Sequence, residues 1–429
     1  MYFCRTKMRI YAKTFNKNMI KRDFYLQQII NRMHNGMIKV ITGIRRCGKS
    51  YLLFNIFSDY LKEIGIDDNH IIKIDLEDRR NKSLRDPDVL LSYIDGKMQD
   101  ENMYYILLDE VQKVAEFEDV LNSYLKVKNA DVYVTGSNSK FLSKDVITEF
   151  RGRGDEINIK PLSFSEFLSV FDGSKEDALK EYILYGGLPV VALTKEPLEK
   201  EKYLKDLFET TYLKDIKERY SIKNDAEMGE LINILASSIG GLTNPTKMAN
   251  TFKSVKNIDI SKNTIISYLE ILQDVFMIEK SERYDIKGKR YINTPSKYYF
   301  DDLGLRNARL NFRQIEETHL MENLIYNELR RRGMAVDVGE VVVNTIVEGK
   351  NTRKQLEVDF VCNLGYRRLY IQSAYSVADD DKREQELRPL RHINDSFQKI
   401  IIVWDNIPRY QNNDGVLFIS IYDFLRGEL

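Results

Sequence analysis

The segment Gly43–Ser50 constrains this chain more than any other feature of its sequence. It reads Gly-Ile-Arg-Arg-Cys-Gly-Lys-Ser, which fits the pattern Gly-x-x-x-x-Gly-Lys-Ser/Thr. Glycines at these positions let backbone N–H groups curl around a phosphate without Cβ clashes. The lysine offers a positive charge to phosphate oxygens, and the serine hydroxyl can ligate Mg²⁺. The motif therefore predicts a phosphate-binding loop.

The residues on either side of the loop support this interpretation. The β-like run Ile38–Thr42 precedes it, and a helical pattern over Tyr51–Gly65 follows at once. The amino end of that helix would then face the phosphates. The same letters can arise by chance in an ordinary Gly-Lys-Ser turn, but the strand–loop–helix context favours nucleotide binding. The predicted nucleotide-binding residues are Gly43, Ile44, Arg45, Arg46, Cys47, Gly48, Lys49, Ser50 and Tyr51.

A second motif pairs an apolar run with two acids. Tyr104–Leu108 reads as a buried strand, and Asp109 and Glu110 follow it directly. Alone, such a strand end is often only a pair of solvated acids. After a phosphate loop, Asp109 is predicted to hold Mg²⁺ together with Ser50. Glu110 is predicted to polarise the attacking water. The two motifs together favour nucleotide hydrolysis over mere binding, with Lys49 and Glu110 as catalytic residues.

Further catalytic candidates follow the next predicted strand, Val132–Thr135. Asn138 or Ser137 could reach the γ-phosphate or the water, although an ordinary turn explains both equally well. Arg151 and Arg153 lie in a glycine-rich stretch beyond. A guanidinium supplied by a neighbouring subunit or domain would stabilise charge on the transferring phosphate. A solvated basic loop is the alternative for these two arginines.

The first part of the chain alternates strand-like and helical patterns. Such alternation predicts an α/β fold with a parallel sheet covered on both faces. A chain of 429 residues is long enough for two or three domains. The predicted strands are Ile38–Thr42, Ile71–Asp75, Tyr104–Leu108, Val132–Thr135 and Asp155–Ile159.

The middle of the chain reads as mainly helical. Asn224–Lys289 has the order helix, helix, helix, hairpin, which suits a winged helix-turn-helix. Ser261 is the predicted N-cap of its recognition helix, Asn263–Leu272. Basic residues in this segment could contact double-stranded DNA, but acids interleave with them, and a helical lid on the ATPase core is the alternative. The basic residues are Lys253, Lys256, Lys262, Lys287, Lys289 and Arg290.

Composition narrows the setting in which the protein works. The formal net charge is zero, so nucleic-acid binding would need a local basic patch. Three widely spaced cysteines fit a reducing cytoplasm and suggest no zinc site. No apolar run is long enough to span a membrane, and the basic start of the chain lacks the apolar core of a secretory signal. We therefore expect a cytoplasmic protein without membrane contact.

The motifs together resemble a group of prokaryotic AAA-type ATPases that carry a C-terminal DUF4143-type domain. The resemblance covers nearly the whole chain from about Met19, and several unrelated motifs occur in the right order. The matching stretches are Val40–Ser50, Leu107–Gln112, Thr135–Lys140, Pro161–Leu168, Tyr185–Pro189, Tyr212–Tyr220, Thr264–Leu272 and Glu357–Val361.

The resemblance implies a P-loop, AAA-like core, a winged helix and a C-terminal α/β domain of restriction-endonuclease type. ATP and Mg²⁺ are the implied cofactors, and a homo-oligomer is possible. The expected organisation is an N-terminal extension (1–18), ATPase core (19–161), helical lid or linker (162–223), winged helix (224–298) and nuclease-like domain (299–429).

The nuclease-like domain departs from the catalytic pattern of such enzymes. They place two acids and a lysine around Mg²⁺. Glu322 and Asp359 could be metal acids, but Gln372 stands where the second acid belongs and Ala374 where the lysine belongs. We therefore expect a catalytically degenerate domain. A nuclease whose basic group has moved to Lys354 or Arg367 is the alternative.

Three functions follow from this sequence. The preferred one is an ATP-driven switch or remodeller acting on DNA or a protein partner. The others are an ATP-regulated, metal-dependent nuclease and a DNA-binding regulator that uses ATP only for assembly. Cleavage of DNA would identify the second, and salt-sensitive DNA binding without turnover the third.

Overall fold

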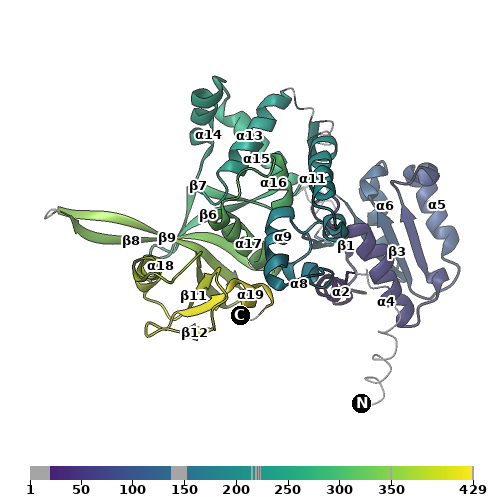
Figure 1. Cartoon of the computed structure of the whole chain (residues 1–429). Coiled ribbons are helices and arrows are strands. Elements are labelled where there is room, and N and C mark those ends of the chain that lie inside the picture. The colour runs from purple at the N-terminus through teal and green to yellow at the C-terminus, as the bar shows by residue number, and fades with distance from the viewer. Residues whose placement is uncertain are drawn as a thin grey trace, which may run out of the picture. The chain divides into compact units, whose positions relative to one another are not determined.

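The computed structural model describes residues 20–136, 152–213, 216–217, 220, 222, 224–347 and 350–427. The chain forms two compact units, shown in Figure 1. Unit 1 comprises Met1–Ala178 and Leu188–Lys195, and unit 2 comprises Leu179–Gly187 and Glu196–Leu429. The described residues form one sheet of five strands and another of eight.

The sheet of unit 1 is entirely parallel. Its order is β2-β3-β4-β1-β5, so β4 separates β1 from β3. The predicted α/β class with a parallel core is thereby confirmed, and each predicted strand lies within a residue or two of an observed one. The strands are β1 (Ile38–Thr42), β2 (Ile71–Asp75), β3 (Tyr104–Asp109), β4 (Ala130–Thr135) and β5 (Gly154–Asn158).

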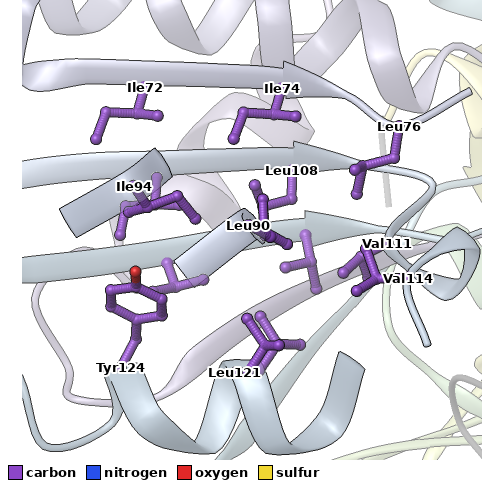
Figure 2. Close-up of a cluster of buried hydrophobic side chains, with 14 of the residues drawn as sticks. Ile72, Ile74, Leu76, Leu90, Ile94, Leu108, Val111, Val114, Leu121 and Tyr124 are labelled. Atoms are coloured by element: carbon purple, nitrogen blue, oxygen red, sulfur yellow. The ribbon is translucent and has the colours of Figure 1, made fainter. Parts of the chain in front are cut away.

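Helices bury both faces of this sheet. On one face, Ile72, Ile74 and Leu108 pack against α5 (Pro87–Lys97) and α6 (Phe117–Tyr124), as Figure 2 shows. Asp86 starts α5, because its carboxylate accepts the N–H groups of Asp88 and Val89. Apolar side chains fill both layers, which is why the strands read as continuous apolar runs.

The opposite face is covered by the helix that leaves the phosphate loop. This helix is continuous over α3 (Lys49–Tyr51), η1 (Leu52–Phe57) and α4 (Ser58–Glu63). Phe57 lies 4.7 Å, centroid to centroid, from the ring of Tyr133 on β4. Packing of this helix on the sheet fixes the direction in which its amino end points. The remaining elements of this region are α2 (Asp23–Ile30), η2 (Asp68–His70), η3 (Arg79–Arg85), η4 (Val111–Lys113), α8 (Phe164–Leu168) and α10 (Pro189–Leu193).

Unit 2 begins with helices that lead into the second sheet. Ser261 caps α15 as predicted, because its hydroxyl accepts the Thr264 N–H at 3.0 Å. The helices are α9 (Lys175–Tyr185), α11 (Pro197–Asp206), η6 (Leu207–Leu213), α13 (Asp225–Ser237), α14 (Pro245–Thr251), η7 (Phe252–Lys256), α15 (Lys262–Asp274), α16 (Leu303–Arg309), α17 (Glu317–Arg331), α18 (Asp380–Arg391) and α19 (Ile421–Leu425).

The second sheet is mixed, in the order β12-β13-β11-β10-β9-β8-β6-β7. The hairpin β6–β7, expected as the wing of a winged helix, pairs through β6 with β8 and so forms one edge of this sheet. The boundary expected between residues 298 and 299 falls inside β7. The strands are β6 (Ile278–Asp285), β7 (Arg290–Phe300), β8 (Ala335–Val347), β9 (Lys350–Leu364), β10 (Arg367–Ala374), β11 (Gln398–Val403), β12 (Tyr410–Gln411) and β13 (Leu417–Ser420).

The core of unit 2 lies between this sheet and α18. Val358, Tyr370 and Ile401 pack with Leu387 and Leu390 of the helix. Among the described residues, no helix combines the length and apolar character needed to cross a membrane.

Candidate active site

The loop Gly43–Gly48 joins β1 to the helix that starts at Lys49, and its glycines are required by its shape. Gly43 has φ +136°, and a Cβ there would lie 2.1 Å from the carbonyl oxygen of Ile159. Gly48 has φ +100° and directly precedes the helix. Both conformations are rarely adopted by residues with a Cβ. The pattern of glycines in the sequence thus corresponds to a real backbone constraint.

Lys49 lies folded back into this loop. Its side chain is buried, and Nζ donates to the carbonyl oxygens of Gly43 at 3.0 Å and Ile44 at 3.2 Å. Two neutral acceptors satisfy the ammonium here without an anion. A phosphate would offer the same ammonium a stronger, charge-assisted partner.

Asp109 ends β3 at the carboxyl edge of the sheet, where the loop also lies. Its side chain is buried and accepts a hydrogen bond from the hydroxyl of Thr135. Burial raises the pKa of Asp109, and the neighbouring hydroxyls of Thr135 and Ser50 oppose that rise. The fold therefore brings together Ser50 and Asp109, the two residues predicted to hold Mg²⁺.

Thr135, at the end of β4, was not among the residues predicted from the sequence. Its hydroxyl donates to Oδ1 of Asp109 and accepts the Glu110 N–H at 3.0 Å. Because β4 lies beside β3 in the sheet, Thr135 can align both acids at once. The sequence did contain a signal for Thr135: it is a polar residue at the end of a buried strand. The predicted candidates, Ser137 and Asn138, follow it shortly.

Glu110 has an unusual backbone conformation. Its φ is +53° and ψ +47°, the left-handed region, which costs a residue with a Cβ about 1–2 kcal/mol. Its half-buried side chain accepts a hydrogen bond from the Gln112 amide. Strained residues held by their surroundings are concentrated at functional sites.

Arg22 braces the loop from outside. It is only 4% exposed, and its guanidinium donates to the carbonyl oxygens of Cys47 at 3.0 Å and Lys160 at 2.7 Å. In a trans peptide the carbonyl and the following N–H point in opposite directions. Holding the Cys47 carbonyl toward Arg22 therefore turns the Gly48 N–H away from it. No sequence pattern marks this arginine.

The matching stretch Pro161–Leu168 holds that arginine in place. Ser163 and Glu166 form a capping box at the start of α8: the Glu166 N–H donates to the serine hydroxyl at 3.2 Å, and the Ser163 N–H donates to the glutamate at 2.8 Å. The other oxygen of Glu166 lies 3.1 Å from Nε of Arg22. One glutamate thus starts the helix and neutralises the arginine.

Three of the other predicted residues lie at the rim of the loop, whereas Ile44 and Cys47 are buried. Arg45 is 3.5 Å from Glu77, Arg46 is exposed with φ +68°, and Tyr51 is 43% exposed. None of these side chains adds a charge to the interior of the loop, where Lys49 lies.

Arg153 lies at the wrong edge of the sheet to act on its own chain's nucleotide. Its carbonyl accepts the Ile38 N–H at 2.9 Å, so it sits at the amino ends of β1 and β5. The five residues of β1, about 16 Å, separate that edge from the phosphate loop. A finger role for Arg153 would thus require a second copy of the chain. Ser137, Asn138 and Arg151 lie outside the described residues.

The nuclease-like positions of unit 2 lie close together. Glu322 on α17, Asp359 on β9 and Gln372 on β10 line a cavity of about 970 Å³. Gln372 is committed to its neighbours: its amide oxygen accepts the Asp359 N–H at 2.8 Å, and its amide nitrogen donates to Glu386 at 3.0 Å. Ala374, two residues further along β10, is buried in the apolar core beneath α18. A further charged residue missed in the sequence, Lys297, contacts Glu322.

Comparison with solved structures finds distant similarities. The structure is similar to an Aeropyrum pernix ORC1 protein solved in complex with DNA, with 10% identity over 69% of this chain and 94% of that one, at a TM-score of 0.30. It is also similar to AMPPCP-bound DnaA from Aquifex aeolicus, with 14% identity over 58% and 85% of the two chains, at a TM-score of 0.28.

Comparison of sequences is more specific. Residues 35–168 match the AAA domain family, and residues 176–316 match a domain of unknown function, DUF8612, rather than the DUF4143 type expected from the motifs. An uncharacterized protein of Haemophilus influenzae is 34% identical over 96% of this chain and 99% of its own length. One of Methanocaldococcus jannaschii is 32% identical over 86% and 80%. The chain therefore belongs to the family of these two uncharacterized proteins and carries an AAA-type P-loop ATPase domain.

Proposed function

We propose that unit 1 binds ATP with Mg²⁺ and hydrolyses it, and that turnover switches the state of a DNA or protein partner. One observation carries the proposal: Ser50, at the start of the helix that leaves the phosphate loop, and Asp109, at the end of β3, lie close enough for the serine to lower the pKa of the carboxyl. They come from strands that are not neighbours in the sheet, so only the fold joins them. A hydroxyl and a carboxylate at the foot of a phosphate loop form the donor set that a nucleotide-bound Mg²⁺ requires.

The residues present fit Mg²⁺ because both candidate ligands carry hard oxygen atoms. Ser50 and Asp109 would hold the ion, and when bound it would neutralise charge on the phosphates. Burial disfavours the charged form of Asp109, so a cation would also relieve the desolvation of this carboxylate. Without the ion, the Thr135 hydroxyl keeps the Asp109 carboxylate aligned.

Lys49 would bind the phosphates, and Glu110 would activate the attacking water. Lys49 would exchange its two carbonyl partners for the β and γ phosphate oxygens. Glu110 follows the metal acid directly, and its left-handed backbone turns it off the strand. There it would accept the proton of the attacking water, with Gln112 holding one of its oxygens.

The switch has two candidate partners. The basic residues of the middle segment keep double-stranded DNA as a candidate, and a second copy of the chain is the other. Turnover of ATP measured with and without duplex DNA, at two salt concentrations, distinguishes a DNA-responsive switch from one that responds to protein.

Two substitutions test the site. Lys49→Ala should abolish nucleotide binding, because the loop loses its positive charge. Glu110→Gln should retain binding and lower turnover by about 10²–10⁴-fold, the usual contribution of a general base. Lys97→Ala, an exposed lysine on α5, is the matched control and should change neither. Unchanged phosphate release and nucleotide affinity in both site variants would refute the proposal.

A further inference from the structure

Three carboxylates converge in the cavity of unit 2. Glu322 comes from α17, and Glu357 and Asp359 come from one face of β9. Glu322 is only 8% exposed. Buried carboxylates are unfavourable unless they are paired with a cation or coordinate a metal. In a nuclease of the expected type that cation would be Mg²⁺.

Lys297 already provides a cation at this position. It is 2% exposed, and its Nζ lies 2.8 Å from Oε1 of Glu322 and 2.7 Å from Oε1 of Glu357. The side chains of β7 alternate between its two faces, so Lys297 and Tyr299 both point toward Glu322. Tyr299 donates to the same oxygen of Glu322 at 2.6 Å. That oxygen therefore accepts two strong hydrogen bonds.

A divalent metal would compete with this ammonium for the same atoms. Mg²⁺ needs oxygen ligands at about 2.0–2.1 Å in octahedral geometry, and the ammonium nitrogen lies within hydrogen-bond distance of two of the oxygens it would use. Asp359 is occupied too, since its Oδ2 accepts the Ser373 N–H at 2.8 Å. In the part of the chain that the structure describes, no group of three or more His, Cys, Asp and Glu side chains is arranged to hold a metal.

We infer that the Lys297 ammonium is the built-in cation of this cavity and takes the place of a divalent metal, so that unit 2 folds without one. Gln372 and Ala374 explain why the pattern lacks catalytic groups, whereas Lys297 explains how Glu322 stays buried beside Glu357 and Asp359.

The charge states of the cluster agree with this arrangement. Burial opposes the charged form of Lys297, but attraction by Glu322, Asp359 and Glu357 outweighs it and raises the pKa of the lysine. Burial, followed by repulsion from Glu322, raises the pKa of Asp359. The lysine thus stays charged beside these carboxylates.

Thermal unfolding of the full chain without nucleotide tests the inference. The wild type should melt at the same temperature in EDTA and in millimolar MnCl₂. Lys297→Met removes the ammonium but keeps most of the volume, so its melting temperature in EDTA should fall by about 5–15 °C, and MnCl₂ should restore a substantial part of the loss. Lys297→Arg keeps the charge and should remain indifferent to MnCl₂.

Two controls separate the outcomes. Lys354→Met removes an exposed lysine that lines the same cavity, and it should gain no metal dependence. Calorimetric titration with MnCl₂ should give the same result for the wild type and for Asp359→Ala. Mn²⁺ binding that is present in the wild type and lost in Asp359→Ala would overturn the inference. A folded Lys297→Met protein that ignores MnCl₂ would overturn it as well. If that variant does not fold, the wild-type titration decides.

Discussion

Each unit of this protein buries carboxylates, but the two units treat them differently. In unit 1, Asp109 receives a hydrogen bond from the hydroxyl of Thr135, which aligns it without neutralising it. In unit 2, Glu322 receives an ammonium and a phenol. A carboxylate aligned by neutral donors is prepared to bind a cation, whereas one paired with lysine is already complete. The type of donor therefore decides which acid can take part in chemistry.

Breaking the pair in unit 2 should give the largest effect on stability. Glu322→Gln leaves the buried Lys297 with one close carboxylate fewer, and removing one partner of a buried pair costs about 3–5 kcal/mol. Urea unfolding should report a loss of this size, and ATP turnover per folded molecule should be unchanged. Glu384→Gln, which removes an exposed partner of Arg391 at the same cavity, should cost less than about 1 kcal/mol. Equal losses in the two variants would contradict the comparison.

Neutralising Asp109 of unit 1 should have the opposite effect: ATP turnover should fall, and stability should be kept. Asp109→Asn keeps the shape but loses the charge for Mg²⁺, so turnover should fall by about 10²–10³-fold. Without nucleotide the variant should be at least as stable as the wild type. The pKa of Asp109 is raised in the folded state, so the stability it contributes is present at low pH and is lost as pH rises through that pKa.

The pH dependence provides the measurement for this variant. Melting temperatures recorded between pH 4 and pH 8 should diverge in favour of Asp109→Asn toward the alkaline end. A variant that is active but unstable at pH 8 would show that Asp109 is structural. Asp88→Asn, in the exposed first turn of α5, is the matched control.

The smallest predicted effect concerns the brace behind the loop. Arg22→Met frees the Cys47 carbonyl, so the Gly48 N–H loses its fixed direction and ATP affinity should weaken about 10-fold, a typical loss for residues that position a binding group. Fluorescence titration with an ATP analogue, well below the melting temperature, measures it. Arg32→Met breaks a comparable pair with Asp155 at the far end of α2 and should leave the affinity unchanged. Equal affinities for Arg22→Met and wild type would remove Arg22 from the site.

Local patterns in the sequence were sufficient to predict much of unit 1. The spans of β1 and β2, the glycines of the phosphate loop and the position of Asp109 all follow from contiguous residues: apolar runs, a turn that needs positive φ, and acids at a strand end. These features depend on neighbours along the chain, so they can be read without knowing the strand order.

Only the tertiary structure decided which side chains meet. Arg22 donates to a carbonyl 138 residues away, Thr135 reaches Asp109 because β4 lies beside β3, and Lys297 of β7 contacts Glu322 of α17. The same strand order put Arg153 at the edge opposite the loop. Hydrogen bonds and ion pairs act over a few ångströms of space, and distance along the chain does not determine distance in space. The sequence by itself therefore determined the phosphate loop and the acids that follow β3. Only the fold decided that Thr135 supports Asp109 and that Lys297 neutralises Glu322.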